Sequence, residues 1–244
     1  MKEKIYTIPV NDAFDSESEC PFCTLGQKLE KEVLDYVMGP SYMEEDVREQ
    51  TDLMGFCKEH YRQMLAAGNR LGVAIMLKTH IKKINDDMKD ILKREAERCE
   101  GRKKLFSKND EPSPFCEYEN KLSGSCYACN RIEGRMASYF DTFFHLWKTE
   151  DEFRAKVTGG KGFCMEHFAR LLAESEKKLN AAVRKQLIDA LIPIQQQSFK
   201  RLEDEVEWFI KKFDYRFKDE PWKTSKDAAE RGILKVSGYN GGVL

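Results

Sequence analysis

The same four-residue signature occurs twice in this chain of 244 residues. In each half, a Cys-x-x-Cys pair precedes a Gly-Phe-Cys-x-x-His segment, with 33 residues between the pair and the later cysteine in the first half and 34 in the second. The cysteine pair recurs at an offset of 106 positions and the Cys-x-x-His pair at 107. The repeated residues are Cys20, Cys23, Cys57 and His60, then Cys126, Cys129, Cys164 and His167.

Three thiols and one imidazole form the donor set of a closed tetrahedral zinc site. Residues three apart share one face of a helix, so both members of each Cys-x-x-His pair can bind one ion. We therefore predict two zinc ions per chain, each bound within one half of the repeat: Cys20, Cys23, Cys57 and His60 for one ion, and Cys126, Cys129, Cys164 and His167 for the other. An iron–sulfur centre is the alternative, because thiolate-rich sites also bind iron.

The remaining cysteines and histidines do not follow the repeat. Cys99 and Cys116 have no partner at the repeat offset, and we interpret them as spare thiols, although Cys116 could compete for the second ion. His80 and His145 also lack counterparts, and we interpret them as ordinary helix histidines.

The composition favours an all-α fold. Only 7 residues are proline, 34% are charged, and stretches of alternating apolar and polar residues are scarce. The repeat predicts two similar helical units, each held by a Cys3His metal site and packed through long antiparallel helices. The predicted segments are an extended N-terminal arm (1–19), a first metal-binding unit (20–100), a linker (101–125), a second metal-binding unit (126–217), and a C-terminal helix and tail (218–244).

Catalysis is disfavoured by the sequence. Four protein ligands leave no open position on a zinc ion for water or substrate. The chain contains neither a glycine-rich phosphate loop nor a nucleophile elbow. No apolar run approaches the ~20 residues that span a bilayer, and the N-terminus lacks the apolar core of a secretory signal. We expect a cytoplasmic protein with reduced cysteines and no membrane association.

The charge pattern favours a protein partner over a nucleic acid. The net charge is −1, and acidic residues interleave with the basic ones in the most basic stretch, 89–108. We therefore expect an interaction or regulatory module with an unknown protein partner or with itself as a homodimer. The principal alternative is a metal- or redox-responsive switch, in which oxidation releases the ions. A nucleic-acid-binding role, carried by Lys103 and Lys104, is a further alternative.

Several segments resemble an uncharacterised family of bacterial cytoplasmic proteins, a domain of unknown function with paired CPxC and GFCxxH motifs. The resemblance implies a duplicated helical architecture and no established activity. Cys126-Tyr-Ala-Cys129 departs from the proline-containing form of the first motif. The resemblance covers most of the chain and is carried by Tyr6–Asn11, Cys20–Cys23, Gly39–Arg48, Gly55–Cys57, His60 and Asn69–Gly72.

Overall fold

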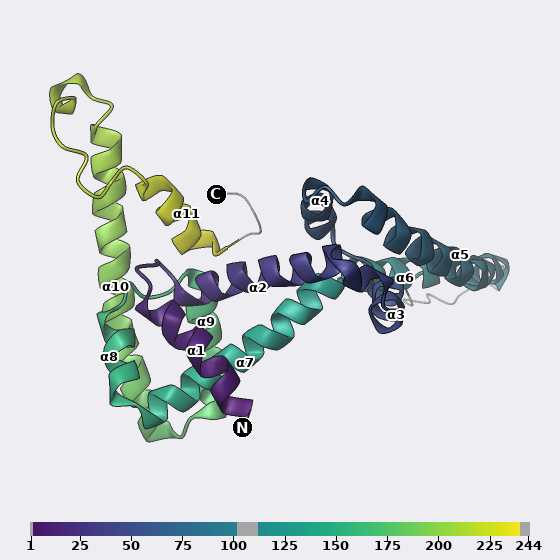
Figure 1. Cartoon of the computed structure of the whole chain (residues 1–244), viewed down its shortest axis with the longest axis horizontal. Coiled ribbons are helices and arrows are strands. Elements are labelled where there is room, and N and C mark those ends of the chain that lie inside the picture. The colour runs from purple at the N-terminus through teal and green to yellow at the C-terminus, as the bar shows by residue number, and fades with distance from the viewer. Residues whose placement is uncertain (1, 102–111, 240–244) are drawn as a thin grey trace. The chain divides into compact units, whose positions relative to one another are not determined.

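The fold is all-α, as the sequence predicts. The computed structural model describes residues 2–101 and 112–239, and these contain helices and loops without a strand (Figure 1). The helices are α1 (Lys2–Asp15), α2 (Pro21–Met38), η1 (Pro40–Met43), α3 (Glu45–Met54), α4 (Lys58–Ala66), α5 (Arg70–Gly101), α6 (Pro114–Ser123), α7 (Tyr127–Thr149), α8 (Asp151–Gly159), α9 (Met165–Lys178), α10 (Ala181–Lys211), η2 (Tyr215–Phe217) and α11 (Ala228–Ser237).

The chain forms two compact units, and one is inserted into the other. Unit 1 comprises Met1–Leu29 and Gly134–Leu244, and unit 2 comprises Glu30–Glu133. Both boundaries fall inside helices, namely α2 and α7. This division differs from the two consecutive units that the repeat suggests. Each copy of the repeat contributes a long helix that begins in one unit and ends in the other.

The N-terminal segment is a helix, which corrects the predicted extended arm. Residues Lys2–Asp15 form α1, with Pro9 inside it. Val10, Ala13 and Phe14 are buried. Ala13 and Phe14 follow Val10 by three and four positions, so the three side chains share the face of the helix that packs in unit 1. Helix α1 contacts α8. The burial of this face stabilises a helix that Pro9 alone would disfavour.

Part of the predicted linker is also helical. Helix α6 packs against α5, and its first turn is capped by the Ser113 hydroxyl, which accepts a hydrogen bond from the backbone N–H of Cys116. The Ser113 hydroxyl also donates to Glu95 of α5 at 2.7 Å. Residues 102–111, which include Lys103 and Lys104 of the basic stretch, lie outside the described residues.

An aromatic cluster forms the core of unit 1. Phe22, which lies between the first two cysteines, stacks on Phe140 of α7 with 4.0 Å between ring centroids and 7° between ring planes. Further buried rings surround this pair, and they come from α1, α7, α8 and the loop before α9: Phe14, Phe143, Phe153 and Phe163. Burying phenylalanine side chains contributes about 1.5–3 kcal/mol each, so this cluster fixes the segments that carry the cysteines.

The core of unit 2 is aliphatic and lies around the second cysteine pair. Helix α5 packs against α3, α4 and α6. Tyr127, which follows Cys126, is fully buried in this core and lies edge-on to Phe56. The other buried members come from α2, α3, α4, α5 and the start of α7: Val33, Val37, Val47, Met64, Val73, Met76 and Ala128.

Candidate metal centres

The eight repeated cysteines and histidines meet in two clusters that could each hold a metal ion. Site 1 consists of Cys20, Cys23, Cys164 and His167, all in unit 1. Site 2 consists of Cys57, His60, Cys126 and Cys129, all in unit 2. Within each site the four ligand atoms lie within 4.8 Å of one another.

The predicted pairing within each half of the repeat is therefore wrong. Each cysteine pair meets the Cys-x-x-His segment of the other copy: Cys20 and Cys23 do not join Cys57 and His60, and Cys126 and Cys129 do not join Cys164 and His167. The eight residues are those that the sequence singles out. Their partners are exchanged between the two copies.

Helix lengths explain the exchange. Each cysteine pair lies at the start of a long helix, α2 with 18 residues or α7 with 23, and a rise of 1.5 Å per residue gives lengths of about 27 and 34 Å. The next α-helices, α3 with 10 residues and α8 with 9, span only about 15 and 14 Å. They are too short to retrace the preceding helix. The chain therefore reaches its Cys-x-x-His segment without returning to its own cysteine pair.

The distances in site 1 fit one tetrahedral ion. Nδ1 of His167 lies 3.5 Å from Sγ of Cys20, 3.4 Å from Sγ of Cys23 and 3.1 Å from Sγ of Cys164. The Sγ atoms of Cys23 and Cys164 are 3.5 Å apart. Tetrahedral zinc with Zn–S near 2.3 Å and Zn–N near 2.0 Å requires about 3.5 Å between sulfur and nitrogen and about 3.8 Å between sulfurs.

Site 2 has the same arrangement. Nδ1 of His60 lies 3.1 Å from Sγ of Cys57, 3.3 Å from Sγ of Cys126 and 3.5 Å from Sγ of Cys129. The Sγ atoms of Cys57 and Cys129 are 4.0 Å apart. In both sites all the sulfurs face the same imidazole nitrogen, which is the geometry of a shared ion.

The charge states of the donors reflect their crowding. Burial lowers the pKa of His167, but hydrogen bonds with Cys164 and Cys20 outweigh this effect and raise the pKa to about 10. Hydrogen bonds from Cys20 and Cys23 hold the pKa of Cys164 well below its usual range, and the bond to Cys164 raises the pKa of Cys23. One ionised thiol thus keeps its neighbour protonated. A divalent cation would relieve this repulsion and allow all the thiols to ionise.

Site 2 shows the same electrostatic pattern. Burial lowers the pKa of His60, but hydrogen bonds with Cys126 and Glu30 outweigh it and raise the pKa to about 10. Burial raises the pKa of the Cys126 thiol, whereas the hydrogen bond from His60 lowers it, with a net value of about 6. Burial and the neighbouring Cys126 raise the pKa of Cys129.

The glycine of each Gly-Phe-Cys motif has a conformational role. Gly55 and Gly162 have φ angles of +59° and +76°, in the left-handed region that favours glycine. A Cβ atom on Gly55 would lie 2.3 Å from Nε2 of His80, and one on Gly162 would lie 2.9 Å from Oε1 of Gln195. His80, interpreted from the sequence as an ordinary helix histidine, is thus packed against the turn that presents Cys57.

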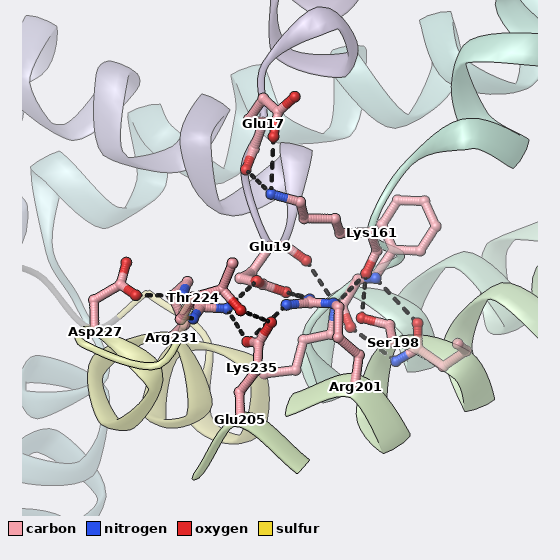
Figure 2. A network of polar contacts seen from close by, with 12 residues as sticks. Glu17, Glu19, Lys161, Ser198, Arg201, Glu205, Thr224, Asp227, Arg231 and Lys235 are labelled. Carbon is pink, nitrogen blue, oxygen red and sulfur yellow. Dashed lines mark hydrogen bonds and ion pairs between the residues drawn. The ribbon is translucent and has the colours of Figure 1, made fainter. Parts of the chain in front are cut away.

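Residues outside the repeat hold the two loops of site 1 together. The buried Lys235 ammonium of α11 donates to the backbone carbonyl of Glu19 at 2.7 Å and to that of Lys161 at 2.5 Å (Figure 2). Glu19 directly precedes Cys20, and Lys161 lies three residues before Cys164. Lys235 therefore bridges the two segments that supply the ligands.

Two side chains of α10 support the second of these segments. The Gln195 amide accepts from the backbone N–H of Phe163 at 3.0 Å and donates to its carbonyl at 2.8 Å. Ser198 donates to the carbonyl of Lys161 at 2.5 Å. These bonds satisfy buried backbone groups of the turn before Cys164.

A buried acidic residue links this framework to α10 and α11. The Glu19 carboxylate is 2.6 Å from Arg201, 3.2 Å from Arg231 and 3.6 Å from Lys235 (Figure 2). Its side chain is 3% exposed. Arg231 also pairs with Glu205 at 2.5 Å and with Asp227 at 3.0 Å, so the cluster contains three acids and three bases.

Site 2 is held by a different set of contacts. The backbone N–H of Tyr127 donates to the carbonyl of Gly55 at 3.0 Å, and the Ser125 hydroxyl donates to the carbonyl of Met54 at 2.7 Å. Both bonds join the Cys57 turn to the Cys126 turn. Glu30 of α2 lies 3.3 Å from Nε2 of His60, the nitrogen that faces away from the cysteines. A carboxylate in this position orients a metal-binding histidine.

The supporting residues carry no sequence signal. Glu19, Glu30, Gln195 and Lys235 lie outside the repeated motifs, and polar residues of these types are ordinary on helices. Cys116 is exposed on α6 and belongs to neither cluster, and the side chain of Cys99 lies outside the described residues. In the described part of the chain, no helix has the length and apolarity of a transmembrane segment.

Comparison with known proteins identifies a family. The sequence model of a family of unknown function, DUF6062, matches residues 1–241. No curated protein and no solved structure matches the chain. Because the match spans both copies of the motif and nearly the whole sequence, the chain belongs to the family of unknown function DUF6062.

Proposed function

We propose that this protein is a non-catalytic module in which two zinc ions hold a helical scaffold that binds another protein. The observation that carries the proposal is the closure of each site by four protein donors within 4.8 Å. A catalytic zinc ion keeps one position for water or substrate, whereas a structural one has four protein ligands. The four protein donors of each cluster support the second form.

The compactness of the donor sets favours a single ion over an iron–sulfur cluster. In a cluster the cysteines bind different iron atoms and must stand further apart than ligands of one ion. Thiolates with one imidazole at tetrahedral spacing are the preferred donors of zinc. Structural zinc in small peptides contributes roughly 10–16 kcal/mol at neutral pH, which is comparable with the net stability of a whole domain.

An apolar groove supports the interaction role. It lies between α10 and α11, has a volume of about 410 Å³, and includes Glu203 and Glu207 among its lining residues. Ile210 and Val236 line it and are 63% and 64% exposed. Contiguous exposed apolar surface of this kind is typical of protein interaction sites. We propose that this groove binds an apolar segment of a protein partner, with a second copy of the chain as the first partner to test.

Native mass spectrometry tests the metal part of the proposal. Protein purified without added metal should carry the mass of two zinc ions per chain, and elemental analysis should give the same ratio. A protein without metal, or a brown protein whose mass includes iron and inorganic sulfide, would contradict it. The same spectra give the oligomeric state.

A matched pair of variants tests the groove. Ile210→Asp places a charge in the groove, whereas Ile192→Asp changes another exposed isoleucine of α10 that does not line it. We expect Ile210→Asp to abolish self-association in sedimentation measurements and Ile192→Asp to leave it unchanged. Equal effects of the two substitutions, or a wild-type monomer at all concentrations, would exclude the homodimer.

A metal- or redox-responsive switch is the second candidate function. The observation that favours it is the exposure of Cys129, because a solvent oxidant can reach an exposed cysteine, which is a thiolate when it binds zinc. The nucleic-acid alternative depends on Lys103 and Lys104, which lie outside the described residues.

A further inference from the structure

The two metal centres differ in how far they are shielded from solvent. In site 1 the cysteines are almost completely buried: Cys20 and Cys164 are 0% exposed and Cys23 is 3% exposed. In site 2 only Cys126 is buried among the cysteines, whereas Cys57 is half-buried and Cys129 is exposed. Donor chemistry and spacing are otherwise the same.

The C-terminal helix contributes to the burial of site 1. Helix α11 packs on α9 and α10, and Lys235 anchors it to the backbone on both sides of the site (Figure 2). At its C-terminus, a Cβ atom on Gly238 would lie 3.7 Å from Sγ of Cys164. The chain therefore passes directly over a ligand of site 1. Among the residues that the structure describes, Cys129 of site 2 remains exposed.

We propose that site 2 is an oxidant-sensitive metal site in which Cys57 and Cys129 form a disulfide and release the ion, while site 1 keeps its ion. The proposal rests on the proposed zinc binding. It assigns the switch function to one of the two centres and leaves the other as a permanent structural site.

The chemistry requires hydrogen peroxide or another hydroperoxide as the oxidant. The exposed Cys129 sulfur, which is a thiolate when it binds zinc, attacks a peroxide oxygen, the O–O bond breaks, and the products are a sulfenic acid and hydroxide. The Cys57 thiolate, whose sulfur is 4.0 Å away, then attacks the sulfenic sulfur, forms the S–S bond and expels a second hydroxide. Two thiolates lose two electrons and the peroxide gains them. The ion loses two of its four ligands and dissociates.

Stepwise oxidation of the zinc-loaded full chain tests the proposal. Hydrogen peroxide is added in the presence of a chromophoric zinc chelator, and peptide mapping locates the disulfide. We expect one of the two zinc equivalents to be released, with a Cys57–Cys129 disulfide, and the second to remain until the protein is denatured. A thiol reductant with added zinc should restore the starting stoichiometry.

Three results would overturn the proposal. They are release of both ions together, retention of both ions, and a disulfide between any other pair of cysteines. If the purified protein contains no zinc before oxidation, the proposed function itself fails. If it contains two zinc ions that respond equally, only the present inference fails.

A variant that keeps all eight candidate ligands tests whether the zinc ion that is released on oxidation comes from site 2. Glu30→Gln weakens the support of His60 and should accelerate the release of one equivalent only. Gln195→Glu disturbs the turn at Phe163 in site 1, so it should instead accelerate release of the zinc equivalent that the wild-type protein retains, called here the slow equivalent. An effect of Glu30→Gln on the slow equivalent would contradict the assignment of the labile ion to site 2.

Discussion

The buried carboxylate of Glu19 should be a principal source of the stability of unit 1, and Glu19→Gln tests this. The substitution keeps the shape of the side chain and removes its charge. Arg201 and Arg231 are 31% and 20% exposed and retain Glu205, so solvent and this second acid still compensate them. Lys235 is 1% exposed, and Glu19 is the carboxylate beside it at 3.6 Å. The cost therefore arises mainly at Lys235.

The magnitude follows from the cost of leaving a buried charge without its partner. Breaking a buried ion pair typically costs about 3–5 kcal/mol. Because Lys235 keeps its two bonds to backbone carbonyls, we take the lower limit, about 3 kcal/mol. With a denaturant dependence of about 1–3 kcal/mol per molar urea, the unfolding midpoint should fall by roughly 1–3 M. The measurement is urea unfolding of the zinc-loaded protein, followed by circular dichroism.

Glu17→Gln is the matched control. Glu17 lies two residues away, pairs with Lys161 at 3.1 Å, and its side chain is 94% exposed. An exposed pair contributes little because of solvent screening, so we expect a change below about 0.5 kcal/mol. If both substitutions shift the midpoint equally, or if Glu19→Gln shifts it by no more than the control, the reasoning about burial is refuted.

A double-mutant cycle tests whether the destabilisation by Glu19→Gln arises from the charge of Lys235 that is left without its partner. Lys235→Met removes the ammonium and keeps most of the side-chain volume. If the cost of Glu19→Gln arises at Lys235, the double variant should be less destabilised than the sum of the single variants, by about 1–3 kcal/mol. Strict additivity would place the cost at the arginines instead.

Three further perturbations test the scaffold. Removal of zinc with a strong chelator should lower the helical signal at 222 nm and abolish the cooperative thermal transition, and an unchanged melting curve would show that the ions are not structural. Gly55→Ala should lower the free energy of unfolding by about 2–4 kcal/mol, because it adds a clash with His80 to the strain of a positive φ. Gly68 has a φ of +91° but lies in open space, so Gly68→Ala should cost only about 1 kcal/mol in the same chemical unfolding assay. Glu30→Gln should weaken zinc binding at His60 by about 10–100-fold in competition with a chelator, and an unchanged affinity would exclude the orienting role of the carboxylate.

The eight residues that form the two clusters could be predicted from the sequence, but the way in which they divide between the clusters could not. Cysteine and histidine at fixed spacing report metal chemistry, and the second copy makes coincidence implausible. The repeat allows two pairings, however, because either cysteine pair can form a site with either Cys-x-x-His segment. Only the relative lengths of α2 and α3, and of α7 and α8, distinguish them.

The supporting contacts were beyond sequence reasoning for a different reason. Glu19 and Lys235 are 216 positions apart, and neither belongs to a periodic pattern that predicts burial. Charged residues are usually exposed, so a sequence-based prediction places both at the surface. The helical state of α1 was missed in the same way, because Pro9 suggests an extended segment until the burial of Val10 and Phe14 is known.

Loop entropy does not explain why the ligands are exchanged between the copies. The ion of site 1 would close a loop with a sequence separation of 141 between Cys23 and Cys164, and that of site 2 a separation of 66 between His60 and Cys126. Each doubling of a loop costs only about 0.6 kcal/mol, so the longer loops cost about 1 kcal/mol more than closure within one copy. The roughly 10–16 kcal/mol of a structural zinc ion exceeds this difference by far. The rigid lengths of α2 and α7 therefore decide which donors meet. Since the smaller loop lies within the larger one, an ion in site 2 would close unit 2, and an ion in site 1 would join the two chain segments that the insertion of unit 2 separates.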